Sequence, residues 1–91
     1  MIKTIKGTLI ALNLDNDKEI AFEVISVNGL RFEIVSEEEL DMEVVYKLYL
    51  SFNIVTHECI FRVVSDKGSN RYMIDLIAPN SLMINELKNI G

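Results

Sequence analysis

His57 and Cys59 are the side chains of this sequence best suited to nucleophilic chemistry, and they stand two positions apart. A cysteine with a neighbouring histidine can act as nucleophile and base. On a strand, however, side chains two positions apart lie roughly 7 Å from each other, which is too far for a direct hydrogen bond. One histidine and one cysteine also fall short of the four ligands that structural zinc requires. We therefore expect no catalytic residue and no metal site, and we expect both side chains to pack in the core or to be half-exposed.

The segment EEELDME, residues 37–43, holds five carboxylates in seven residues. A calcium loop would need alternating oxygen ligands and a glycine at its bend, and this segment has no glycine. We expect a solvated acidic turn that repels some partners and attracts a basic one. Ser36, with Glu39 three residues later, has the spacing of a capping box for a short turn.

The stretch VISVNGLRF, residues 24–32, places polar residues and a glycine between two apolar runs. Asn28-Gly29 favours a positive φ and a tight reversal between strands, and the Ser26 hydroxyl can bond to the local backbone. The stretch is therefore either a plain hairpin turn or a ligand-binding loop, and the residues that would bind the ligand are Ser26, Asn28, Gly29 and Arg31.

Period-two alternation of apolar residues predicts the strands that position these side chains. Six runs show it or are continuously apolar, at residues 8–14, 19–24, 30–34, 44–54, 56–65 and 71–78. The clusters DNDK, residues 15–18, and DKGSN, residues 66–70, are typical of turns. After Pro79, a cap at Asn80 or Ser81 begins a short amphipathic helix, whose apolar residues include Leu82, Met83, Leu87 and Ile90. Short strands at this spacing predict an all-β fold, a six-stranded antiparallel β-barrel with a C-terminal α-helix over one open end or edge.

The later strands carry apolar residues on both faces. A sheet whose outer face meets water would alternate apolar with polar residues, so these strands predict a covered outer surface. The cover is either a protein partner or second copy, or the domain's own helix and loops. The outward apolar residues are Val45, Tyr49, Ile60, Val64, Met73 and Ile77.

Taken together, VISVNGLRF, YKLYLSF, CIFRVV, RYMIDLI and the terminal helix resemble a PilZ domain over about residues 7–90. That bacterial family is a six-stranded barrel, and many members bind cyclic di-GMP. Its loop motif is Asp or Asn, any residue, Ser, two of any residue, then Gly. Ser26 and Gly29 match the motif, whereas Val24 stands where the family has Asp or Asn.

The family also has two arginines four positions apart, upstream of its first strand. The first thirty residues here contain no arginine, and Lys3 and Lys6 are the nearest basic residues. Lysine lacks the planar fork with which arginine stacks on guanine and bonds phosphate in a bidentate manner. The resemblance therefore implies a degenerate member that acts through protein contacts and holds no cofactor. The alternative that it implies is a weak receptor for cyclic di-GMP, with Ser26, Asn28, Gly29, Arg31, Lys3 and Lys6 as its binding residues.

The composition narrows the class of protein further. Ninety-one residues predict one domain, residues 1–91. A net charge of −5 disfavours binding to nucleic acid, because such binding relies on Lys and Arg to neutralise phosphates. We see no membrane-length apolar run, no secretory leader and only one cysteine, and these features indicate a cytoplasmic protein without a membrane segment. No triad, metal cluster or phosphate loop suggests an enzyme.

Overall fold

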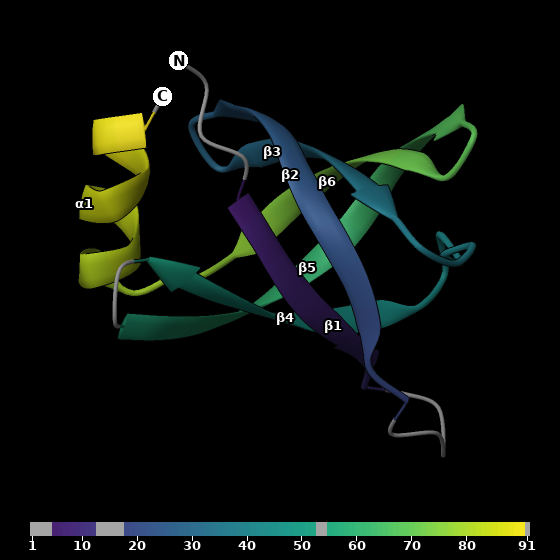
Figure 1. Cartoon of the computed structure of the whole chain (residues 1–91), viewed down its shortest axis with the longest axis horizontal. Helices are drawn as coiled ribbons and strands as arrows, with labels where there is room; N and C mark the ends of the chain where they lie inside the picture. Colours follow the sequence, from purple (N-terminus) through teal and green to yellow (C-terminus); the bar gives the residue numbers. More distant parts are fainter. Residues whose placement is uncertain (1–4, 13–17, 53–54, 91) are drawn as a thin grey trace.

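The chain folds into a closed barrel of six antiparallel strands followed by one helix, as the sequence predicts (Figure 1). The computed structural model describes residues 5–12, 18–52 and 55–90. The strands follow one another around the barrel in the order β1-β2-β3-β6-β5-β4, and β1 pairs with β4 to close it. The elements are β1 (Ile5–Ala11), β2 (Ile20–Asn28), β3 (Arg31–Ser36), β4 (Val45–Phe52), β5 (Val55–Gly68), β6 (Arg71–Ile77) and α1 (Ser81–Ile90).

Alternate residues of each strand point inward and form a single core. Leu9, Phe32 and Leu48 are fully buried, and the rings of Tyr46 and Phe61 stack with centroids 5.5 Å apart. Each such side chain contributes about 1.5–3 kcal/mol through its removal from water. The inward set reproduces the period-two pattern of the sequence, as does the burial of His57 and Cys59 on one face of β5.

Gly7 is the position where two strands approach too closely for any side chain. A Cβ atom built there would lie 2.3 Å from the backbone oxygen of Tyr49 and 3.0 Å from the ring of Phe22. Gly7 pairs with Phe22 on one side and with Leu50 on the other, and these two side chains together with the Tyr49 backbone oxygen occupy the space that a side chain at Gly7 would need.

Two strand boundaries differ from the sequence prediction. β1 begins at Ile5, so Lys6 lies inside the first strand rather than upstream of it. β5 continues to Gly68 through two register shifts, and the expected five-residue loop shrinks to Ser69–Asn70. Both of these residues have positive φ, 54° and 60°, as a tight type I′ hairpin requires.

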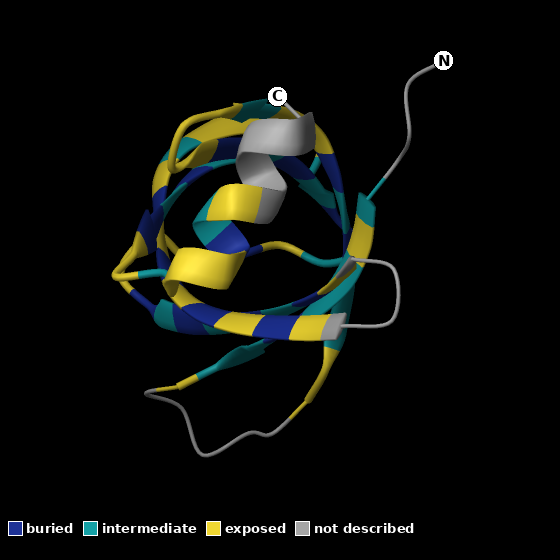
Figure 2. Ribbon diagram, turned by 90° about the vertical axis from the view of Figure 1, so that its left-hand side faces the viewer, coloured by how far each residue is buried: buried dark blue, intermediate teal, exposed yellow. Residues whose placement is uncertain are grey.

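Helix α1 closes one open end of the barrel, as expected (Figures 1 and 2). The Asn80 side chain caps it, because the backbone N–H of Met83 donates to Asn80 Oδ1 at 2.8 Å. Met83 is completely buried in the core, whereas Leu82 beside it is 67% exposed. The side chains of Leu87 and Ile90 lie outside the described set. No helix of the described segments is long and apolar enough to cross a bilayer.

The acidic segment between β3 and β4 lies at the opposite end from α1 (Figure 1) and is anchored by two tyrosines. The N–H of Leu40 donates to the Tyr72 hydroxyl at 2.9 Å, and that of Asp41 donates to the Tyr46 hydroxyl at 2.8 Å. Leu40 itself joins the core, while the carboxylates of the segment stay exposed or half-buried.

The capping box expected between Ser36 and Glu39 is wrong, because the Ser36 hydroxyl does not accept the N–H of Glu39. The Ser36 hydroxyl instead accepts the N–H of Glu38, two residues later, at 3.2 Å. A hydroxyl that bonds two residues ahead stabilises a local turn rather than a helix start.

Candidate functional site

The stretch singled out in the sequence forms the hairpin between β2 and β3. Asn28 pairs with Arg31, so only Gly29 and Leu30 make the turn. Gly29 has φ 63° and stands first in the turn, the position at which a type II′ hairpin takes glycine. This local geometry follows from the glycine alone and needs no ligand.

A β-bulge in β2 decides which side chains of the motif reach the surface. The register shifts between Val24 and Ser26, which leaves Ile25 as the extra residue. Val24 points into the core and is 5% exposed, whereas Ser26 is exposed beside Glu33. The position at which the family motif has Asp or Asn therefore belongs to the core in this chain.

The arginines near the hairpin are held by carboxylates of neighbouring strands. Arg31 donates Nε and Nη2 to the two oxygens of Asp75, at 2.7 and 3.0 Å. Arg71 donates to Glu33 at 2.8 Å. Hydrogen bonding to Asp75 raises the pKa of Arg31, and the same bond lowers the pKa of Asp75. An anion at this hairpin would have to displace a carboxylate from either guanidinium.

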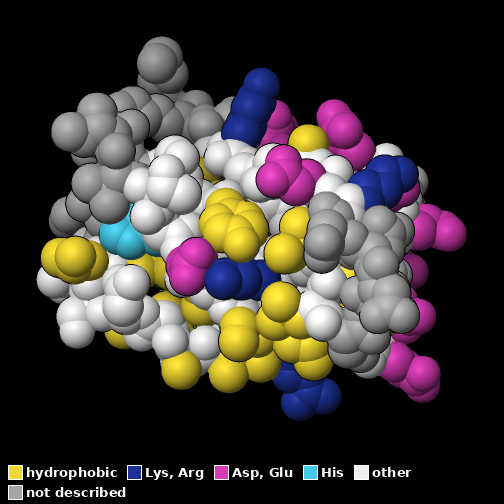
Figure 3. Space-filling model, turned by 90° about the horizontal axis from the view of Figure 1, so that it is seen from below, with side chains coloured by type: hydrophobic (Ala, Val, Ile, Leu, Met, Phe, Trp, Pro, Cys, Tyr) yellow, Lys and Arg dark blue, Asp and Glu magenta, His cyan; other side chains and the backbone are white. Residues whose placement is uncertain are grey.

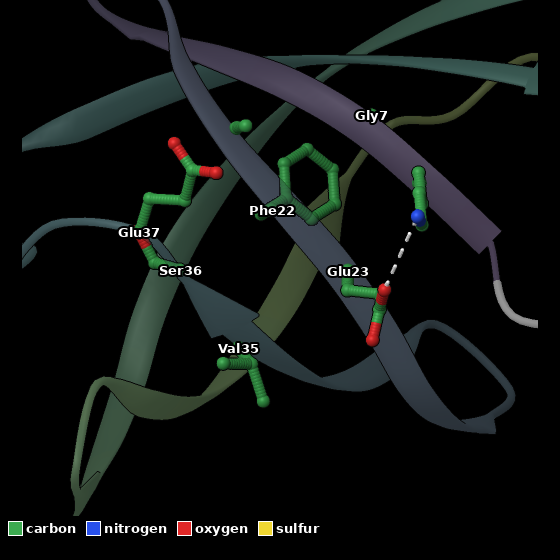
Figure 4. A pocket seen from close by; sticks show the side chains of 8 residues that line it. Gly7, Phe22, Glu23, Val35, Ser36 and Glu37 are labelled. Carbon is green, nitrogen blue, oxygen red and sulfur yellow. Dashed lines mark ion pairs between the residues drawn. The ribbon is translucent and has the colours of Figure 1, made fainter.

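Lys6 lies on β1 next to Glu23 of β2, with 3.9 Å between Nζ and Oε1. Both belong to a pocket of about 260 Å³ whose other lining residues are Gly7, Ala21, Phe22, Val35, Ser36 and Glu37 (Figure 4). The pocket sits toward the start of β2 and does not include the hairpin. With two carboxylates against one ammonium, its charge does not suit an anion.

The structure thus brings four of the six predicted binding residues together at one hairpin and leaves Lys6 apart. Ser26, Asn28, Gly29 and Arg31 share the end of β2 and the start of β3, and Lys3 falls outside the described residues. Asp75, Glu33 and Arg71 were missed as neighbours of this hairpin. The alternation in the sequence places all three on outward positions of their strands. The register between β3 and β6, which brings them next to one another, cannot be read from the sequence.

His57 and Cys59 both point into the barrel from β5 and are nearly inaccessible, with 4% and 6% exposed. Burial raises the pKa of the Cys59 thiol, which donates to the backbone oxygens of Ile60 at 3.3 Å and Ile77 at 3.5 Å. A buried protonated thiol is a poor nucleophile. Within the part of the chain that the structure describes, no three His, Cys, Asp or Glu side chains gather as metal ligands would.

A second candidate site is an apolar surface on the outside of the barrel, centred on β5, which lies opposite β2 in the strand order. Ile10, Lys47, Ile60 and Ile77 are successive cross-strand partners on β1, β4, β5 and β6. Two residues along the strands from this row, the next outward pairs are Tyr49 with Glu58 in one direction and Val45 with Arg62 in the other. We name the outward side chains of these eight residues the β5 face: Ile10, Val45, Lys47, Tyr49, Glu58, Ile60, Arg62 and Ile77.

The β5 face is not covered by α1, which lies over the barrel end (Figure 2). Ile60 and Ile77 are each 40% exposed, and Val45 and Tyr49 are half-buried. Hydrophobic side chains gather over this side of the molecule, interspersed with a few charged groups (Figure 3). Lys47 lies between Tyr49 and Glu58, with Nζ 3.3 Å from the Glu58 carboxylate and 5.5 Å from the centre of the Tyr49 ring.

Two of the outward apolar residues predicted from sequence lie beyond the β5 face. Val64 lies at the bulge of β5 between Val63 and Ser65 and is 39% exposed, and Met73 is half-buried beside Glu33 of β3.

No protein-family model matches the chain, and searches of curated proteins and of solved structures found no similar protein.

Proposed function

We propose that this chain is a non-enzymatic, PilZ-like bacterial signalling module that acts in the cytoplasm through protein–protein contacts and holds no nucleotide. The observation that carries the proposal is the β5 face, where Ile60 and Ile77 lie side by side on the outside of a closed barrel and Lys47 separates them from Ile10. Single exposed apolar residues are common on any protein. A contiguous group bordered by charges is instead characteristic of a surface that binds protein.

The mixture of apolar and charged side chains on the β5 face favours a protein partner. The whole chain has 14 acidic and 9 basic residues, yet the face holds Lys47 and Arg62 against Glu58 alone. Lys47 is engaged by Glu58, whose hydrogen bond raises the pKa of the lysine. Arg62 is exposed and forms no ion pair with any described residue of its own chain. A mixed apolar and polar surface of this kind matches the composition of protein interfaces.

The experiment is co-purification from cells that express the tagged protein, with Ile60→Lys compared against wild type. A lysine at the centre of the face introduces a charge that a docked partner would have to desolvate, so we expect the partner to be lost. Ile25→Lys is the matched control, because Ile25 is 38% exposed on β2, diametrically opposite β5 in the barrel. Equal recovery with both variants, or a wild type that is strictly monomeric and recovers nothing, would refute the proposal.

A further inference from the structure

The residues on either side of Ile60 carry opposite charges at equal distances along β5. Glu58 and Arg62 stand two positions before and two after Ile60, and all three side chains point outward. On a strand this spacing places each charge about 7 Å from the central isoleucine. A strand with this arrangement is complementary to a second copy of itself that runs in the opposite direction.

We propose that a second copy of this chain docks on the β5 face as an isologous dimer, with the two β5 strands antiparallel and the two Ile60 side chains in contact. The inference rests on the proposed function and names its partner. The two-fold axis lies in the plane of contact, at a right angle to β5 and through Ile60. It sets Glu58 opposite the partner's Arg62 and Arg62 opposite the partner's Glu58, so that each dimer has two equivalent ion pairs.

The neighbouring strand fits the same symmetry. Tyr49 and Val45 flank Lys47 on β4 in the rows of Glu58 and Arg62, so the axis places Tyr49 over the partner's Val45. Lys47 lies on the axis row, where two ammonium groups would face each other if they stood upright. Each Lys47 ammonium instead leans along the strand toward Glu58 of its own chain. Because the two-fold axis reverses the strand direction, the two ammonium groups lean in opposite directions and are kept apart.

The contact is small, because the barrel is convex and the whole chain measures only 33 × 24 × 19 Å across its Cα atoms. Two convex sheets touch mainly through β4 and β5, with Ile10 and Ile77 at the edges of the contact. We expect such a contact to bury less than the roughly 1,200 Å² of a standard interface. We therefore expect a weak, reversible dimer that forms at micromolar to millimolar concentration.

Sedimentation equilibrium of the purified charge-reversal variants Glu58→Arg and Arg62→Glu tests the arrangement. Each variant alone places two pairs of like charges in contact, so its dimer dissociation constant rises at least about 10-fold. An equimolar mixture of the two variants restores both ion pairs between the copies, so heterodimers form more tightly than the homodimers of either variant. The mixture also controls for folding, because a misfolded variant cannot be rescued by its counterpart.

Two results would overturn the inference. One is a wild type that remains monomeric at millimolar concentration. The other is a dimer that the single variants do not weaken, or that the mixture does not restore. In either case, co-purification could still recover a partner that Ile60→Lys removes and Ile25→Lys does not. The proposed function would then stand, with a different protein on the β5 face. If Ile60→Lys had no effect either, both the dimer and the proposed function would be refuted.

Discussion

At the scale of single residues, the Tyr46 hydroxyl joins the barrel interior to the acidic segment. Its ring stacks on Phe61 in the core, and its oxygen accepts the Asp41 N–H. Burial raises the pKa of Tyr46 above that of a tyrosine in water. The folded state therefore favours the protonated phenol, and the associated stability is complete below the ordinary tyrosine pKa of about 10 and is lost as the pH rises through the higher folded-state value.

We predict that Tyr46→Phe costs about 1 kcal/mol of unfolding free energy at neutral pH, through the lost hydrogen bond. The difference between wild type and variant should then shrink over the range above about pH 10, because only the wild type has this phenol to ionise. Urea unfolding of both proteins across that range measures it. A difference that stays constant with pH would contradict the assignment.

Sequence reasoning located most inward residues, because period-two alternation follows directly from strand geometry. It did not locate the bulge at Ile25, which reverses the alternation and decides that Ser26 is exposed. It also did not foresee that Arg31 is already bound by Asp75, since 44 residues separate the two along the chain. Contacts of this kind depend on register, and register is set by the whole barrel.

At the scale of elements, α1 contributes to stability through one residue more than through its length. Met83 is completely buried at the barrel end, and Leu82 is its largely exposed neighbour. We predict that Met83→Ala lowers the unfolding free energy by about 2–4 kcal/mol, whereas Leu82→Ala changes it by no more than about 0.5 kcal/mol. Chemical denaturation of the two variants checks this, and equal losses would show that the helix is not seated as described.

The turns could be predicted where glycine or asparagine required them, and not where bulges altered the strands around them. Asn28-Gly29 indicated a tight reversal, and the structure has a two-residue turn one position later, at Gly29 and Leu30. The DKGSN segment indicated a five-residue loop. This prediction was wrong, because two register shifts let β5 continue through Asp66 to Gly68. The anchoring of the acidic segment by Tyr46 and Tyr72 was also invisible, since no local pattern links a loop to hydroxyls inside a barrel.

At the scale of the whole molecule, charge bears most directly on the ligand alternative. The chain carries a net charge of −5, and both Arg31 and Arg71 beside the hairpin are bound by carboxylates. We predict that calorimetric titration with cyclic di-GMP at high micromolar protein gives no binding heat. A measurable affinity that Ser26→Ala and Arg31→Ala both reduce would support the receptor alternative instead, with Lys6→Ala testing whether the separate pocket contributes.

The pairing of β1 with β4 closes the barrel, so each described strand has a neighbouring strand on both sides. Extended peptides cannot join such a sheet by β-strand addition, and neither can neighbouring copies polymerise edge to edge. Recognition on the wall of the barrel then uses outward side chains rather than the strand backbone. A barrel of this kind can exchange one partner for another by outward substitutions while its fold is preserved, so partner choice and foldability can evolve separately.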